Sequence, residues 1–69
     1  MTPVPDLTDR EKAVLVRLAS GMSNQEIAQD MRVGVSTVKT HAHHLFDKLE
    51  VRSRTQALLK AWQFGLLNT

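Results

Sequence analysis

The sequence predicts an all-α domain of four short helices. Apolar residues recur at helical spacing in four separate segments, and no segment shows the apolar–polar alternation of a half-buried strand. The 69 residues suffice for one small domain, whose stability depends on good packing between the helices. The prolines at positions 3 and 5 predict that residues 1–6 form a flexible arm or the remnant of a linker, ahead of a domain at residues 7–67.

Three of the expected helices open with a capping box. In this pattern a Ser or Thr side chain accepts a hydrogen bond from an amide in the first turn, and a Glu or Gln three residues later accepts from the amide of the Ser or Thr. The boxes begin at Thr8, Ser23 and Ser53, and each precedes a segment with helical periodicity. The expected helices cover about residues 9–20, 24–31, 35–49 and 54–64.

The first and fourth expected helices each end at a glycine. Gly21 and Gly65 are suited to the left-handed residue that commonly closes a helix. On the first expected helix, one face gathers Glu11, Val14, Leu15 and Leu18. This face is predicted to contact the core.

The second and third expected helices, with the short break between them, have the spacing of a helix-turn-helix. Two helices joined by a short turn cross at a steep angle, and only small or apolar residues fit at the crossing. Ala28 supplies the small residue, Val33 fills the turn, and Val38 points back from the third helix. Such units often have glycine just before the apolar turn residue, whereas this chain has Arg32 there and Gly34 later. We therefore expect a variant turn.

The third expected helix has two distinct faces. At about 100° per residue, one narrow stripe gathers the apolar residues Val38, Ala42, Leu45 and Leu49. The opposite side is polar and rich in hydrogen-bond donors, and it carries Ser36, Thr40, His43 and Asp47. In a helix-turn-helix the second helix of the unit lies in the major groove, and its N-terminal half meets base edges. The sequence therefore predicts a DNA-binding domain.

The expected DNA contacts follow from this placement. The residues expected to contact base edges are Lys39, Thr40 and His43. The residues expected to contact phosphate lie at two helix starts, where free amides and the helix dipole attract anions; they are Ser23, Asn24, Ser36 and Thr37. Asp47 is expected to lie beyond the groove. Residues 35–69 contain five basic and two acidic side chains, against four and five in residues 1–34, and this excess favours a polyanionic partner.

Five runs of residues, in this order along the chain, resemble those of the LuxR-type helix-turn-helix domain. They are Leu-Thr-Asp-Arg-Glu at 7–11, Ser-Asn-Gln-Glu-Ile-Ala at 23–28, Ser-Thr-Val-Lys-Thr-His at 36–41, Lys-Leu at 48–49 and Ser-Arg-Thr-Gln-Ala at 53–57. The resemblance covers about residues 7–67. It implies a four-helix DNA-binding domain at the end of a larger bacterial transcription regulator, with the third helix in the groove and a dimer contact on the fourth.

The resemblance also bears on single residues. It implies that Glu11 and Arg54 connect the first helix to the start of the fourth. Glu50 stands where the family usually has glycine, so either it adopts a left-handed conformation at a cost of roughly 1 kcal/mol or the turn takes another shape. His43 stands where the family often has a longer basic or polar side chain. On the fourth helix, the outward apolar side and the resemblance together predict a dimer interface of Leu59, Trp62 and Leu66.

Double-stranded DNA is the expected partner, bound by a homodimer at an inverted repeat, because one helix reads too few base pairs to select a site. RNA polymerase is a further candidate partner. Neither a cofactor nor a metal ion is expected, since the spacing of His41, His43 and His44 directs them to different sides of the helix. The sequence has no bilayer-length apolar run and no signal-peptide pattern, so we expect a cytoplasmic protein.

Other classes fit the sequence less well. An enzyme is not expected, because the chain has no cysteine, no paired-carboxylate site, no activated nucleophile and too little length for a cleft. A helical protein-interaction module that does not bind DNA would expose an apolar stripe on the third helix, whereas the outward side of this helix is polar. A sigma-factor region-4-like promoter-recognition domain shares the Leu-Thr-x-Arg-Glu opening and the groove chemistry. The runs at 36–41 and 53–57 favour the LuxR type.

Overall fold

The four predicted helices are all present. The computed structural model describes residues 5–67, so most of the expected N-terminal arm lies outside the described residues. The helices are α1 (Asp9–Ala19), α2 (Asn24–Met31), α3 (Val35–Leu49) and α4 (Arg54–Gln63), and the described residues contain no strand. The all-α prediction is therefore confirmed, with α1 and α4 each ending one residue earlier than expected.

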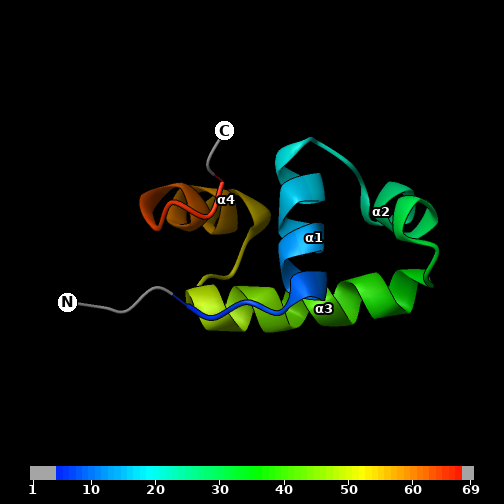
Figure 1. Ribbon diagram of the computed structural model, residues 1–69, viewed down its shortest axis with the longest axis horizontal. Coiled ribbons are helices and arrows are strands. Elements are labelled where there is room, and N and C mark those ends of the chain that lie inside the picture. Colours follow the sequence, from blue (N-terminus) through cyan, green and yellow to red (C-terminus); the bar gives the residue numbers. More distant parts are fainter. Residues whose placement is uncertain (1–4, 68–69) are drawn as a thin grey trace.

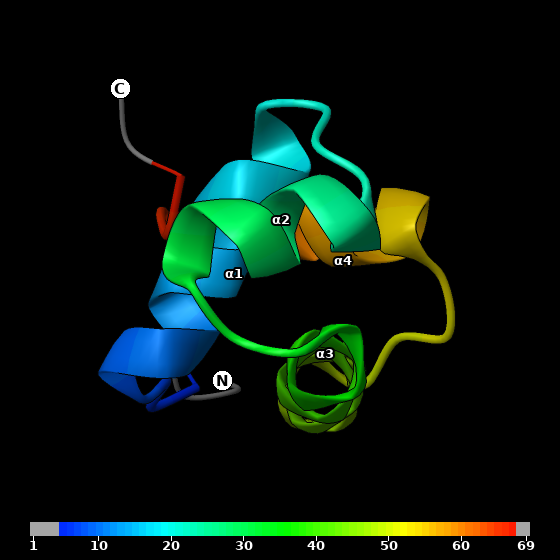
Figure 2. The ribbon, with the colours of Figure 1, turned by 90° about the vertical axis from the view of Figure 1, so that its right-hand side faces the viewer.

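The helix α3 forms the base on which the other three pack. Figure 1 shows α3 lying along one side of the molecule, with α1 crossing it near its middle and α2 and α4 on either side of α1. All three contact α3, and α1 also contacts α2 and α4. In Figure 2, which looks along α3, α2 and α4 lie above it, and α1 descends from above to its left side. Within residues 5–67 the lower side of α3 is covered by no other helix.

The core follows the apolar stripes that the sequence predicts. On α3 the four stripe residues Val38, Ala42, Leu45 and Leu49 are all buried. They meet buried side chains from every other helix, among them Leu15, Ile27 and Ala57. Burying one such leucine or isoleucine contributes about 1.5–3 kcal/mol. This apolar contact fixes which side of α3 faces inward.

Two of the three predicted capping boxes are complete. Thr8 and Ser23 each accept from the amide three residues on, and the Glu at that position accepts from the amide of the cap residue. In the third predicted box only one of the two expected hydrogen bonds is formed. Ser53 Oγ accepts from the Gln56 amide at 3.2 Å, but Gln56 Oε1 accepts from the amide of Arg52 at 3.0 Å. The more extended backbone of Ser53, with φ −139° against −69° and −74° at the other caps, turns its amide away.

The turns after α2 and α3 both place a charged residue in the left-handed conformation. Arg32 and Glu50 each have φ 58°. The expectation of a variant turn at Arg32 is wrong in this respect, because Arg32 itself takes the conformation that glycine favours, and Gly34 has φ −75° and caps α3. At Glu50 the structure decides for the left-handed alternative. Val33 packs against the core, as predicted for the residue that fills the turn.

Candidate nucleic-acid interface

The expected base-contacting residues lie together on the outward side of α3. Lys39, Thr40 and His43 are all exposed, and so are Ser36 and Thr37 at the start of the helix. The Thr40 hydroxyl donates to the Ser36 carbonyl at 3.0 Å, so its proton is used within the helix while its oxygen can still accept. Together these side chains present one ammonium group, one imidazole and short hydroxyls to the solvent.

The N-terminus of α3 has no side-chain cap. Gly34 occupies the cap position, and only its carbonyl takes part, accepting from the amides of Thr37 and Val38 at 3.1 and 3.2 Å. The other three helices are each capped by a hydroxyl side chain, from Thr8, Ser23 and Ser53. The first amides of α3 point out of the helix without such a partner, and the helix dipole adds partial positive charge there. An anion is the natural ligand for these groups.

The two phosphate candidates on α2 have different surroundings. Ser23 is exposed and Asn24 is half-buried. Ser23 Oγ accepts from the Glu26 amide at 3.2 Å and so caps α2. The hydrogen bond from the Ser23 amide, and a second from its side chain, hold the pKa of the exposed Glu26 carboxyl below its ordinary value. A negative charge thus accompanies the phosphate candidates at this helix start.

The three histidines of α3 separate as the sequence predicts. His41 is half-buried, whereas His43 and His44 are exposed, with ring centres 6.2 Å apart. Within residues 5–67 no group of three or more His, Cys, Asp or Glu side chains could hold a metal ion. His43 Nε2 lies 3.4 Å from Asp47 Oδ2, one helical turn along. Sequence reasoning missed this pair, although the spacing of four residues could have revealed it.

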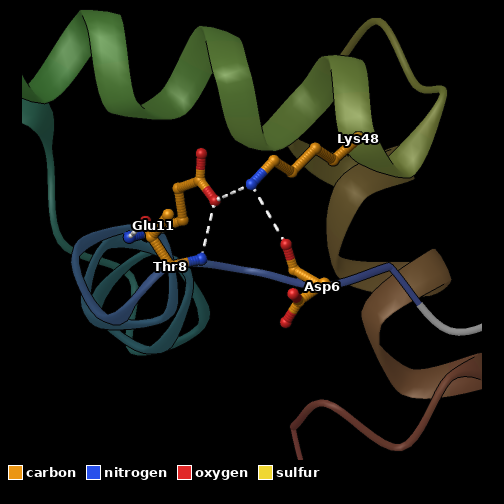
Figure 3. Close-up of polar contacts among 4 residues, drawn as sticks. All are labelled: Asp6, Thr8, Glu11 and Lys48. Atoms are coloured by element: carbon orange, nitrogen blue, oxygen red, sulfur yellow. Dashed lines mark hydrogen bonds and ion pairs between the residues drawn. The ribbon is translucent and has the colours of Figure 1, made fainter.

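A buried carboxylate fastens the other end of α3. Glu11 is 3% exposed, and its Oε1 accepts from Lys48 Nζ at 2.7 Å and from the Thr8 amide at 2.8 Å. Lys48 Nζ also donates to the carbonyl of Asp6 at 3.0 Å. Figure 3 shows the lysine reaching from α3 to both the first turn of α1 and the segment before it. These contacts tie the chain on both sides of Thr8 to the C-terminal turn of α3.

The pKa of Glu11 shows that the hydrogen bonds outweigh the burial. Burial alone raises the pKa of this carboxyl, but the hydrogen bonds from Lys48 and Thr8, with the lysine charge, lower it by more. Its pKa therefore lies below that of an ordinary glutamate, and the side chain is ionised at neutral pH. The sequence placed Glu11 inward correctly. The expected link from Glu11 to the fourth helix is wrong, because its partner is Lys48 on α3.

Arg54 provides the expected connection between α1 and the start of α4. Its guanidinium donates from Nη2 to the Leu18 carbonyl at 2.9 Å. That carbonyl lies in the last turn of α1, where backbone oxygens lack partners within the helix. Arg54 is half-buried, which fits a structural role.

The residues of the predicted dimer interface are not equally available. On α4, Leu59 is 61% exposed and Trp62 is 66% exposed, which is unusual for such large apolar side chains. Leu66 follows α4, is half-buried and packs against the core.

None of the helices in residues 5–67 is both long and apolar enough to cross a membrane.

The helices α2 and α3 cross at a steep angle (Figure 2). The exposed side of α3 is polar, and the N-terminus of α3 has no side-chain cap. These features define a helix-turn-helix domain of the DNA-binding class. A family model described as bacterial regulatory proteins of the luxR family matches residues 5–61. The chain belongs to this family. The response regulator protein VraR of Staphylococcus aureus is 48% identical over 61 residues, which cover 88% of this chain and 29% of that protein. VraR of Staphylococcus epidermidis matches to the same extent.

Two solved structures share the fold and a substantial part of the sequence. The response regulator ChrA of a heme-sensing two-component system superposes with a TM-score of 0.86 and 38% identity, over 94% of this chain and 32% of that one. VqmA of Vibrio cholerae, in complex with a ligand and DNA, gives a TM-score of 0.87 and 30% identity, over 100% of this chain and 30% of that one. The chain thus spans about a third of the length of these proteins or less. It is a LuxR-type domain, homologous to regulators that bind DNA to control transcription.

Proposed function

We propose that α3 inserts into the major groove of double-stranded DNA, with Lys39, Thr40 and His43 against base edges. The carrying observation is that these three side chains of α3 are exposed, Lys39 and Thr40 in the N-terminal half of the helix and His43 just past its middle. Figure 2 shows that one side of α3 is covered by no other helix of residues 5–67. Lys39 can donate to guanine O6 and N7, and Thr40 and His43 can pair with several bases. The exposed face of α3 has no apolar stripe, which disfavours a partner groove on another protein.

Phosphate contacts would hold the helix in register. The uncapped amides of α3, with the exposed hydroxyls of Ser36 and Thr37, form a donor set beside the groove face. Ser23 and Asn24 open α2, which crosses the DNA backbone in a helix-turn-helix. These contacts carry no sequence information, but they fix the orientation of α3.

We further propose that two copies pair on DNA through α4. Leu59 and Trp62 supply exposed apolar area for an isologous contact, and Leu66 contributes only at its edge because it packs against its own core. A two-fold axis between the copies implies an inverted repeat in the DNA. The whole protein would be a regulator in the cytoplasm whose remaining part receives a signal, as its likeness to response regulators suggests, and RNA polymerase would be its partner at the promoter.

The test uses the charge change Lys39→Ala. A duplex is first enriched from a random library by binding to the parent chain, and affinities are then measured by titration. Loss of one base contact costs about 1–3 kcal/mol, so we expect a fall in affinity of about fivefold or more with an unchanged melting curve. Arg52→Ala is the matched control, since Arg52 is exposed at the opposite end of α3. Equal affinities for Lys39→Ala and the parent would refute the groove assignment.

The dimer proposal has its own test in Leu59→Glu. This variant places a charge in the proposed contact between copies. Binding to a full inverted repeat should fall far more than binding to a single half-site, because only the repeat engages both copies. Lys60→Glu, a charge change at the adjacent half-buried position, controls for the altered charge of α4. An equal fall on both duplexes, or no fall on either, would exclude α4 as the interface.

A further inference from the structure

Arg32 adopts a backbone conformation that its side chain disfavours. It closes α2 with φ 58° and ψ 46°, the left-handed region in which the Cβ of an L-residue crowds the carbonyl oxygen. At two other turns the chain uses glycine for such a position, with φ 87° at Gly21 and φ 73° at Gly65. Glycine would occupy the turn after α2 without this strain. The arginine at this position therefore lowers the stability of the fold.

No contact within the described part of the chain compensates for this conformation. Arg32 is exposed, and its guanidinium takes part in none of the hydrogen bonds or ion pairs among residues 5–67. The adjacent acid, Asp30, is bound instead by Arg17, whose Nε lies 2.6 Å from Asp30 Oδ2. The charge of Arg32 is thus left available to a group outside the domain.

The place of Arg32 indicates what that group is. The turn lies at the N-terminal end of α3, where it leads directly into the recognition helix (Figure 1). Arg32 precedes the first residue of α3 by three positions, and Gly34 leaves the first amides of that helix without a side-chain cap. A guanidinium presents a planar fork of donors that binds phosphate in a bidentate manner. Both features offer donors to the same kind of anion.

We propose that Arg32 binds a phosphate of the DNA backbone next to the start of α3. This inference rests on the proposed insertion of α3 into the groove and adds a contact that orients the helix there. The domain gives up stability at this turn and gains affinity for DNA of any sequence. Arg32 is then a positioning residue, whereas Lys39 reads bases.

Glu50 provides a matched comparison within the same chain. It has the same φ of 58°, is exposed, and follows the C-terminal end of α3, far from the groove-facing turns. Its replacement by glycine relieves the same strain without removing a positive charge. Arg32→Gly and Glu50→Gly should therefore agree in their effect on stability and differ in their effect on DNA binding.

The experiment measures melting and DNA affinity over a range of salt concentrations. Two duplexes are used, one of random sequence and one enriched from a random library by the parent chain. Arg32→Gly should raise the Tm by several degrees, as should Glu50→Gly. Arg32→Gly should also weaken binding about tenfold to both duplexes at low salt, and lower the salt slope of log K by about 1 per bound domain. Glu50→Gly should weaken neither.

Two further variants separate charge from backbone. Arg32→Lys should keep most of the affinity, and Arg32→Asn, which tolerates the left-handed conformation, should lose it as Arg32→Gly does. Arg52→Asn removes a distant positive charge and should cause a much smaller loss than Arg32→Asn. Equal losses for these two would overturn the proposal, since the effect would then be that of net charge alone.

The remaining outcomes distinguish this inference from the proposed function. Unchanged binding by Arg32→Gly, while Lys39→Ala loses affinity for the enriched duplex, would overturn the phosphate contact alone. A loss confined to the enriched duplex would also overturn it, because a phosphate contact is independent of sequence. Loss by Arg32→Gly on both duplexes with full binding by Lys39→Ala would support the phosphate contact and refute the base assignment. No binding of either duplex by the parent would overturn both.

Discussion

The two ends of α3 use polar side chains in opposite ways. At the N-terminal end, Lys39 and Ser36 are exposed and Gly34 leaves the first amides uncapped. At the C-terminal end, Lys48 is bound to Glu11 and to the carbonyl of Asp6. One end of the helix exposes its polar groups to solvent, and the other is bonded to two segments that are distant in sequence.

The difference shows how a domain of this size can hold α3, the helix proposed to enter the major groove, in a fixed position. Apolar contacts such as those of Leu45 and Leu49 determine which face of α3 is inward, but the hydrophobic effect behind them is not directional. The ion pair of Lys48 with the buried Glu11 adds a fixed point, because a buried carboxylate must keep its partners. A binding site needs such support to keep its geometry.

The largest effect is expected for Lys48→Met. The methionine fills similar volume but leaves Glu11 buried with only the Thr8 amide as partner. Loss of a hydrogen bond to a charged group costs about 1.5–3 kcal/mol, so the free energy of unfolding should fall by about 2 kcal/mol, measured by urea titration. Lys39→Met makes the same change at the other end and should alter stability by less than about 0.5 kcal/mol. Equal losses would show that the two ends do not differ as described.

A smaller effect is expected from adding a cap at the open end. A Cβ at Gly34 meets only Ser36 Oγ, at 3.8 Å, so a side chain fits there. Gly34→Asn and Gly34→Asp should each raise the free energy of unfolding by a few tenths of a kcal/mol. Only the aspartate should weaken DNA binding, by about fivefold at low salt, because a like charge near a phosphate costs about 1 kcal/mol. The same affinity for both variants would place the phosphate elsewhere.

Because Glu11 binds Lys48 at the C-terminal end of α3, the free energy of unfolding should depend on pH. The pKa of Glu11 is lowered in the folded state, so the folded protein binds fewer protons than the unfolded chain. Its contribution is fully present above the ordinary pKa of glutamate and is lost as the pH falls through the lowered value. Glu11→Gln should flatten the acid side of a plot of unfolding free energy against pH. Glu26, whose pKa is also lowered, should leave a residual slope that Glu11→Gln/Glu26→Gln removes.

The smallest effect is expected for Asp47→Asn, between the two ends. The pair of Asp47 with His43 is about 70% exposed on both sides, and such a pair contributes less than about 0.5 kcal/mol. Thermal unfolding should therefore be nearly unchanged. Removal of the acid should strengthen binding to random-sequence DNA by a small factor at low salt. A stability loss as large as that of Lys48→Met would mean that exposure does not govern the strength of these pairs.

Much of the fold was predictable from contacts between near neighbours. The stripe from Val38 to Leu49 follows from helical periodicity alone, and the caps at Thr8 and Ser23 join residues only three apart. The error at Ser53 shows the limit of this reasoning. The residue types match a capping box there, but the backbone entering α4 comes from a turn whose shape depends on the packing of α3 and α4.

The sequence by itself determined the helices, the inward faces of α1 and α3 and the side of α3 that meets solvent, because these depend on periodicity and on hydrogen bonds within one or two turns. Only the tertiary structure decided that Lys48 binds Glu11, 37 residues away, and that Arg32 and Glu50 take the left-handed conformation. A residue's partner across the core depends on how helices cross. A strained turn persists where the packed helices on both sides leave the chain no other route.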